Sequence, residues 1–134
     1  MIFVDTGAFL ARHLSRDQHH AVATAAWAKL ASQKARLVTS NFVIDETLTL
    51  LARRTDPAFA VQRGRALYAS TSLTILRPDS ADEVAALERM HKLADHEVSF
   101  TDAVSFVLMA RHGLTTAFTF DRHFADAGFL GWPG

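Results

Sequence analysis

Four carboxylate side chains stand at positions where they could bind a cation. Asp5 and Asp121 each follow a short apolar run, at the point where a strand would end, and Asp102 lies in the first turn of an otherwise apolar segment. Glu46 falls at the edge of the apolar stripe when residues 42–54 are placed on a helical wheel. An isolated ionised carboxylate in apolar surroundings is costly, so such acids should be paired or bound to a metal. Carboxylate oxygens suit Mg²⁺ or Mn²⁺, and an ion held in this way keeps waters, one of which can attack a phosphodiester.

Each acid taken alone also has a purely structural explanation. The Ser-x-x-Asp pattern that ends at Asp102 matches a capping box, in which the acid bonds the start of its own helix. An Asp that follows a strand often caps the next helix or starts a turn, which applies to Asp5 and Asp121. Glu46 could extend into solvent or pair with a nearby arginine. Only the set as a whole favours a cation site.

The order of the predicted elements brings the four acids together. The predicted strands cover residues 2–4, 37–38, 73–76 and 116–120, with a last edge strand or tail at 129–133, and the predicted helices cover 6–14, 21–34, 42–54, 57–69, 81–94 and 99–112. Because strands and helices alternate without a linker or repeat, we expect a single α/β domain over residues 1–134, with three α/β/α layers and a mainly parallel central sheet. Residues that follow parallel strands, or that begin the next helices, meet at the carboxyl edge of such a sheet. The topology therefore predicts one shared site for the acids.

Composition narrows the function classes. The 134 residues include no cysteine, which excludes a disulfide scaffold, a thiolate metal site and a cysteine nucleophile. Lysine plus arginine number 14, as do aspartate plus glutamate, so the formal net charge is zero, whereas a general nucleic-acid binder is normally basic. Attraction for nucleic acid would then be local or pass through a bound cation. We expect a cytoplasmic protein with no membrane association, since we find neither a signal peptide nor an apolar run of about 20 residues.

Other residues that could do chemistry lack a supporting pattern. Seven histidines are present without an HExxH motif, and we expect surface, capping or packing roles for them. His123 lies near Asp121 and could support that acid, but we expect a packing role for it. The GxSxG, Walker and GxGxxG motifs are absent, which leaves acyl hydrolases, P-loop enzymes and dinucleotide enzymes without support. We expect Arg12 and Arg122 to contact substrate, because each closely follows a candidate acid. We assign the phenylalanines mainly to the core and both tryptophans to packing or interfaces.

Three segments give the chain a resemblance to a known family. Ile-Phe-Val-Asp5, Ser-Phe-Thr-Asp102-Ala and Thr-Phe-Asp121-Arg-His-Phe resemble the PIN-domain nucleases, and most closely the VapC-type toxins of toxin–antitoxin pairs. Glu46, in a leucine-rich helix, completes the pattern. The resemblance implies that these four acids are catalytic and hold one or two Mg²⁺ or Mn²⁺ ions. It also implies a PIN-like fold, endoribonuclease activity often directed at tRNA or rRNA, a cognate antitoxin protein and a homodimer. Thr6 stands where the family commonly has a small polar residue, which implies a contact with substrate or water.

Other interpretations remain open. The chain could be a non-catalytic PIN-like module that binds protein or RNA, or a nuclease of RNA processing or quality control, and the pattern does not separate these from a toxin. A phosphoryl-transfer domain of the receiver or phosphatase kind also gathers acids and Mg²⁺ at a strand edge. Phosphatases of that kind usually carry Asp-x-Asp after the first strand, whereas Asp5 is followed by Thr-Gly, which counts against this class.

Overall fold

A five-stranded parallel sheet lies at the centre of the molecule, whose residues 1–134 are all described by a computed structural model. The strands are β1 (Ile2–Val4), β2 (Leu37–Ser40), β3 (Leu73–Leu76), β4 (Thr116–Phe118) and β5 (Leu130–Trp132). They lie in the order β3-β2-β1-β4-β5, and every neighbouring pair is parallel. The prediction of an α/β fold with a mainly parallel sheet is confirmed. The C-terminal segment, which the sequence left open, is an edge strand of this sheet.

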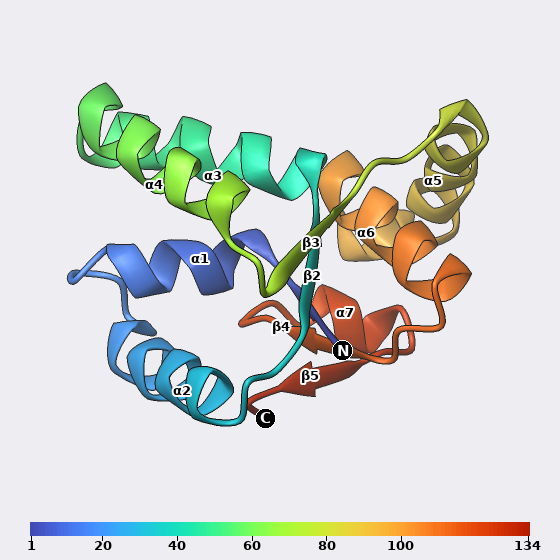
Figure 1. Cartoon of the computed structure of the whole chain (residues 1–134). Coiled ribbons are helices and arrows are strands. Elements are labelled where there is room, and N and C mark those ends of the chain that lie inside the picture. The colour runs from blue at the N-terminus through green and yellow to red at the C-terminus, as the bar shows by residue number, and fades with distance from the viewer.

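Helices cover the sheet on both sides. They are α1 (Thr6–His13), α2 (His20–Ser32), α3 (Asn41–Arg54), α4 (Pro57–Ala69), α5 (Ser80–Lys92), α6 (Phe100–Arg111) and α7 (His123–Asp126), with a 3₁₀ turn at Ala94–His96. In Figure 1, α1 to α4 lie on one side of the strands, and α5 and α6 lie on the other. Right-handed crossovers explain this division, because the chain steps outward from β1 to β3 and then returns across β1 to reach β4. No helix has the length and apolar character needed to span a membrane.

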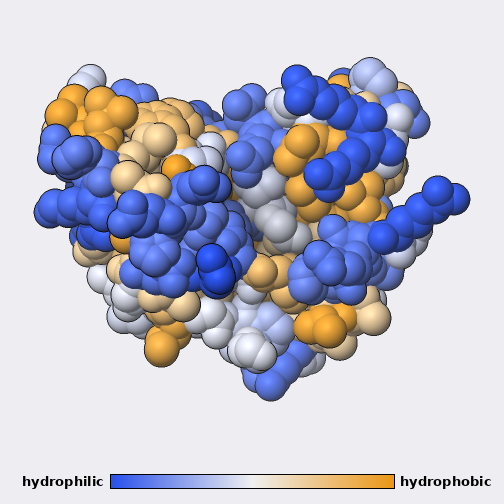
Figure 2. Space-filling model, turned by 180° about the vertical axis from the view of Figure 1, so that it is seen from behind, coloured by the Kyte–Doolittle hydropathy of each residue, from blue (hydrophilic) through white to orange (hydrophobic).

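The two helix groups leave a hollow between them. Figure 2 shows the molecule from behind, with two protruding parts, here called shoulders, on either side of a hollow at the top of the view. Comparison with Figure 1 assigns one shoulder to α5 and α6 and the other to α3 and α4. In Figure 1, β2 runs upward toward the gap between these two groups and continues into α3. The carboxyl ends of the strands form the edge where parallel sheets build their sites.

The central strands β1 and β4 are almost completely buried. Phe3 and Val4 of β1 and Ala117 and Phe118 of β4 have no exposed surface. Burial on both faces explains why these strands are continuous apolar runs without alternating polar residues. Trp27 packs against Phe118 with the ring centroids 5.1 Å apart and donates its indole N–H to a carbonyl of α1, so its predicted packing role is confirmed.

Two strand boundaries differ from the prediction by two residues. β2 continues through Thr39 and Ser40, because both residues pair with β3, and their hydroxyl groups find partners inside the protein. Thr39 donates to a β1 carbonyl oxygen at 2.8 Å, and Ser40 caps α3 by accepting the backbone N–H of Val43 at 3.1 Å. β4 ends at Phe118 and not at Phe120, and the chain then turns toward the acids.

The strand order creates a switch point between β1 and β4. The connection that leaves β1 leads to β2, whereas the one that leaves β4 leads to β5 on the opposite side. In open parallel sheets, ligands bind outside the carboxyl ends of the strands where the connections diverge in this way. The register pairs Val4 with Phe118, so the residues that follow them, Asp5 and Thr119, begin side by side.

Candidate metal centre

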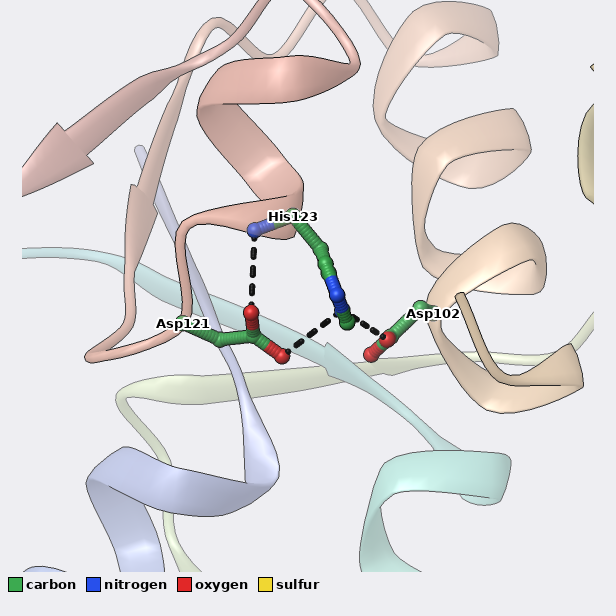
Figure 3. Close-up of side chains that lie close together, drawn as sticks. All are labelled: Asp102, Asp121 and His123. Carbon is green, nitrogen blue, oxygen red and sulfur yellow. Dashed lines mark hydrogen bonds and ion pairs between the residues drawn. The ribbon is translucent and has the colours of Figure 1, made fainter. Parts of the chain in front are cut away.

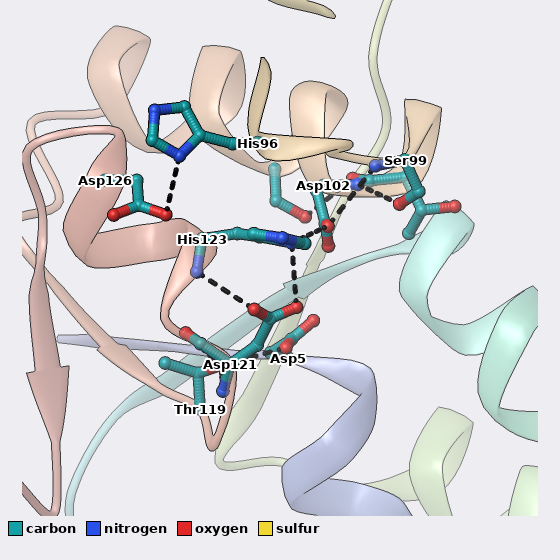
Figure 4. Close-up of polar contacts among 10 residues, drawn as sticks. Asp5, His96, Ser99, Asp102, Thr119, Asp121, His123 and Asp126 are labelled. Atoms are coloured by element: carbon teal, nitrogen blue, oxygen red, sulfur yellow. Dashed lines mark hydrogen bonds and ion pairs between the residues drawn. The ribbon is translucent and has the colours of Figure 1, made fainter. Parts of the chain in front are cut away.

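Four carboxylates line one cavity at the switch point. The cavity has a volume of about 390 Å³, and its acidic lining residues are Asp5, Glu46, Asp102 and Asp121. They come from the loop after β1, from α3, from the first turn of α6 and from the loop after β4. Figure 4 shows Asp5, Asp102 and Asp121 converging from these separate segments. The structure thus brings together the four acids that the sequence predicted to share a site.

Asp5 is held by the neighbouring strand and not by its own helix. It occupies the N-cap position of α1, but its side chain makes no capping hydrogen bond. Its Oδ2 instead accepts a hydrogen bond from the hydroxyl of Thr119 at 3.0 Å, and its backbone N–H donates to the carbonyl of Phe118 at 3.0 Å. The residue is only 5% exposed. Burial and then the charge of Asp102 raise the pKa of Asp5 to about 7. Helix capping therefore does not explain this acid.

Asp102 caps its own helix and also lines the acid cavity. The hydroxyl of Ser99 accepts the backbone N–H of Asp102 at 3.0 Å, and Oδ2 of Asp102 accepts the backbone N–H of Ser99 at 3.4 Å, which completes a capping box. The same Oδ2 lies 3.1 Å from Nδ1 of His123, so Oδ1 is left for a ligand in the cavity. Burial raises the pKa of Asp102, and the hydrogen bond with His123 partly opposes this effect.

His123 joins two of the acids, and the prediction of a packing role for it was wrong. Figure 3 shows its ring between Asp102 and Asp121, with Nδ1 at 3.1 Å from Oδ2 of each. Its backbone N–H also donates to Oδ1 of Asp121 at 2.9 Å. Burial alone would lower the pKa of His123, but the hydrogen bond with Asp102 and the nearby carboxylate charges raise it. The only sequence signal for this role was the position of His123 two residues after Asp121.

Glu46 reaches the cavity from α3, as the helical wheel predicted. It lines the cavity, whereas the neighbouring Asp45 is exposed. None of the ion pairs of the chain involves Glu46, so the alternative of a salt bridge with an arginine at the end of α3 is not realised.

The three residues predicted to contact substrate lie in different places. Thr6 lines the acid cavity, and its hydroxyl oxygen is buried without a hydrogen-bond partner. Arg12 lies instead at a second cavity of about 510 Å³, with its guanidinium carbon 4.6 Å from the centre of the Trp27 ring. No carboxylate lines that second cavity, so it lacks the acidic lining of the first. Arg122 is exposed and does not line the acid cavity, although it follows Asp121 directly.

The donor set of the acid cavity fits a hard divalent cation. Its lining contains four carboxylates and neither lysine nor arginine to neutralise them. Asp102, Asp121 and His123 can place one ligand atom each within 4.8 Å of one another. The unpartnered hydroxyl of Thr6 fits a water molecule in the shell of such an ion. Oxygen-rich sites of this kind suit Mg²⁺ or Mn²⁺ better than zinc.

Comparison with known proteins places these features in a family. The sequence matches the PIN domain family over residues 2–130. It is 37% identical over 130 residues to the 23S rRNA-specific endonuclease VapC20 of Mycobacterium tuberculosis, a match that covers 97% of this chain and 96% of that protein. The crystal structure of VapC20, described as a Sarcin-Ricin loop cleaving toxin, superposes with a TM-score of 0.88 at 35% identity and covers 97% of both chains.

Two further comparisons extend the match. A VapC ribonuclease of Archaeoglobus fulgidus is 34% identical over 107 residues, which cover 78% of this chain and 67% of that protein. A structure of VapBC2 from Rickettsia felis bound to a promoter DNA fragment shares the fold, with a TM-score of 0.69 at 12% identity over 98% of this chain and 97% of that chain. Since the family match spans nearly all of the sequence, the chain belongs to the PIN-domain family, as the three sequence segments indicated.

Proposed function

We propose that the chain is a metal-dependent endoribonuclease and the toxin of a toxin–antitoxin pair. The observation that carries the proposal is the convergence of four carboxylates on one cavity at the switch point of the sheet. The relatives that are 37% and 34% identical are named as an endonuclease and a ribonuclease, which supports the same reaction here. The first of these is named as specific for 23S rRNA, so we propose rRNA as the substrate class and favour it over tRNA. An RNA target of this kind would be met in the cytoplasm.

The four acids would hold one or two Mg²⁺ or Mn²⁺ ions. Bound there, a divalent ion supplies charge that polarises the scissile phosphate and lowers the pKa of a water ligand. The residues of the chain position the reactants: Thr119 orients Asp5, and His123 orients Asp102 and Asp121. A carboxylate of the set accepts the proton of the attacking water.

An antitoxin and a second copy of the chain are the proposed protein partners. The support is the VapC relationship, since two structures of similar fold are VapBC complexes bound to DNA. The antitoxin would suppress cleavage by the full-length protein. Inhibition of rRNA cleavage by the product of a neighbouring short gene would test this part of the proposal.

Cleavage of purified 23S rRNA tests the catalytic proposal. The wild-type protein with Mg²⁺ or Mn²⁺ should release discrete fragments, and EDTA should stop the reaction. Glu46→Gln should slow cleavage more than about 100-fold, because it removes a carboxylate from the cation site. Asp45→Asn is the matched control: it changes the adjacent acid of the same helix, which is exposed, and should cleave like the wild type. Full cleavage in EDTA, or by Glu46→Gln, would overturn the proposal.

A further inference from the structure

An aromatic pair stands in the wall of the acid cavity. The rings of His19 and Phe120 are stacked, with centroids 4.4 Å apart and planes only 2° from parallel. Both residues line the same cavity as the four acids. Both are half-buried, so part of each ring reaches solvent. Core packing therefore does not account for the whole surface of this pair.

The two rings have fixed positions relative to the acids. Phe120 lies between Thr119 and Asp121 in the chain, and the backbone N–H of Asp121 donates to the hydroxyl of Thr119 at 2.9 Å. The same hydroxyl bonds the carboxylate that follows β1, so the turn that carries Phe120 is tied to the cation site. On the other side, the backbone N–H of His19 donates to Oδ1 of Asp17 at 2.8 Å, which fixes the loop before α2. The pair is thus built into the frame that holds the acids.

The chemistry of the cavity wall suits a nucleobase. The lining offers neither lysine nor arginine to bind an RNA backbone, and its carboxylates repel phosphates that are not bridged by a cation. Stacking on an aromatic face needs no opposite charge, and every nucleobase has a face that can stack. A pair of parallel rings beside the cation site is therefore placed to bind the base next to the phosphate that the cation binds.

We infer that His19 and Phe120 form a stacking shelf for the nucleobase that flanks the scissile phosphate. The inference deepens the proposed ribonuclease function and rests on it for the location of the scissile phosphate. The shelf binds and orients the substrate and takes no part in proton transfer. It adds affinity that depends on the presence of a base, and it leaves metal binding unchanged.

Binding of RNA with and without bases tests the stacking shelf. The probes are a fluorescently labelled pool of mixed-sequence RNA dodecamers and the matching sugar–phosphate dodecamer that lacks all bases. Anisotropy titrations in EDTA, at low salt, give a dissociation constant for each probe. Both probes carry the same phosphates, so repulsion by the acids cancels in the ratio of the two constants. The wild-type protein should bind the base-bearing probe about tenfold more tightly. Phe120→Leu and His19→Ala should bring the ratio close to one, and His19→Phe should retain it.

Matched variants separate stacking from loss of fold. Tyr68→Leu removes an aromatic residue that is 55% exposed on α4 and does not line the acid cavity, so its ratio should equal that of the wild type. Thermal melts establish that each variant is folded. An unchanged ratio in both Phe120→Leu and His19→Ala would overturn the stacking shelf, as would a wild-type ratio of one.

Cleavage assays distinguish this inference from the proposed function. In one outcome, the wild type cleaves no RNA with Mg²⁺ or Mn²⁺ while Phe120→Leu still abolishes the preference for base-bearing RNA. That result would contradict the ribonuclease function and support the base-binding role of the pair. If the wild type cleaves RNA but Phe120→Leu and His19→Ala keep its preference for base-bearing RNA, the stacking shelf is contradicted and the ribonuclease function is supported. If both hold, Phe120→Leu should raise the KM for the dodecamer pool by about tenfold.

Discussion

At the residue scale, Asp5 holds its proton more tightly than an ordinary carboxylate. Burial and the charge of Asp102 raise its pKa to about 7, so a cation that binds there displaces a proton. The apparent affinity for Mn²⁺ should therefore rise as the pH rises toward about 7 and level off above it. Calorimetric titrations between about pH 5.5 and pH 8.5 measure this dependence. An affinity for Mn²⁺ that is flat over this range would contradict the assignment of Asp5 as a ligand.

The same raised pKa predicts an effect on the stability of the metal-free protein. Because the folded state binds the proton more tightly than the unfolded chain, this contribution is fully present below about pH 4 and is lost as the pH rises to about 7. In EDTA at about pH 8, ionised Asp5 should cost on the order of 4 kcal/mol. Asp5→Asn removes that charge, so it should raise the melting temperature at about pH 8 and have little effect near pH 4.

Melting curves in EDTA at both pH values check this result, and the exposed Asp45→Asn is the control. The shift for Asp45→Asn should be small at either pH, since surface charges contribute little. If Asp5→Asn is more stable than the wild type but no longer cleaves RNA, the wild-type carboxylate lowers stability and is needed for cleavage. An equal shift in melting temperature at both pH values would contradict the role of the ionised carboxylate.

His123 should act on metal affinity through the acids that its ring contacts. Removal of the ring by His123→Ala frees both Asp102 and Asp121 from their shared partner and should weaken Mn²⁺ binding by about 10- to 100-fold. His123→Asn keeps a donor near the position of Nδ1 and should lose less. His96→Ala removes a histidine that pairs with Asp126 at 3.2 Å outside the cavity, so its Mn²⁺ affinity should equal that of the wild type. Calorimetry compares the Mn²⁺ affinities of the three variants. Equal affinities would contradict a role for His123 in positioning the acids.

At the element scale, the cap of α6 fixes the position of Asp102. Ser99→Ala removes the hydroxyl that accepts the N–H of Asp102 and should lower the free energy of unfolding by about 1 kcal/mol. Ser99→Thr keeps a capping hydroxyl and should remain close to the wild type. Urea denaturation measures both changes, and Mn²⁺ titration shows whether the loosened first turn also weakens the site. A fully stable Ser99→Ala would mean that the capping box contributes little.

The elements could be predicted from the sequence because their apolar runs are unambiguous. The buried strands β1 and β4 carry continuous apolar residues, and the helices have clear starts and ends, so most boundaries fall within two residues. β5 was left open because it is only three residues long and largely exposed, which gives a weak signal. The direction of side chains in the turn after β4 has no periodic signature. For that reason the sequence predicted the acids, favoured packing over a contact with the acids for His123, and missed the His19–Phe120 stack.

The topology of the sheet, and not the local sequence pattern, determines which residues meet at the site. Asp5 had the same cap-like context as many surface residues, and only the pairing of Val4 with Phe118 places Thr119 beside it. Arg12 closely follows Asp5 in the sequence, yet two turns of α1 carry it to the other cavity. Closeness in the chain was therefore a poor guide to contact.

At the scale of the whole molecule, a bound cation would tie together segments from both helix layers. The acids belong to the loops after β1 and β4 and to helices α3 and α6, so the ion binds only the folded arrangement. Mn²⁺ at about 100 times its dissociation constant should stabilise the protein by about 2.7 kcal/mol. Melting curves with and without Mn²⁺ measure this, and Glu46→Gln should lose most of the shift while Asp45→Asn retains it. No shift in the wild type would contradict a specific cation site.

The distance in sequence between the acids also has a consequence for synthesis. Asp5 is translated more than a hundred residues before its partner Thr119 and the acid Asp121. β1 also lacks its neighbour β4 until then, so the nascent chain cannot assemble the centre while most of it has yet to be translated. Under the proposed function, a chain still attached to its ribosome would lack part of the acid set and could not cleave the RNA around it.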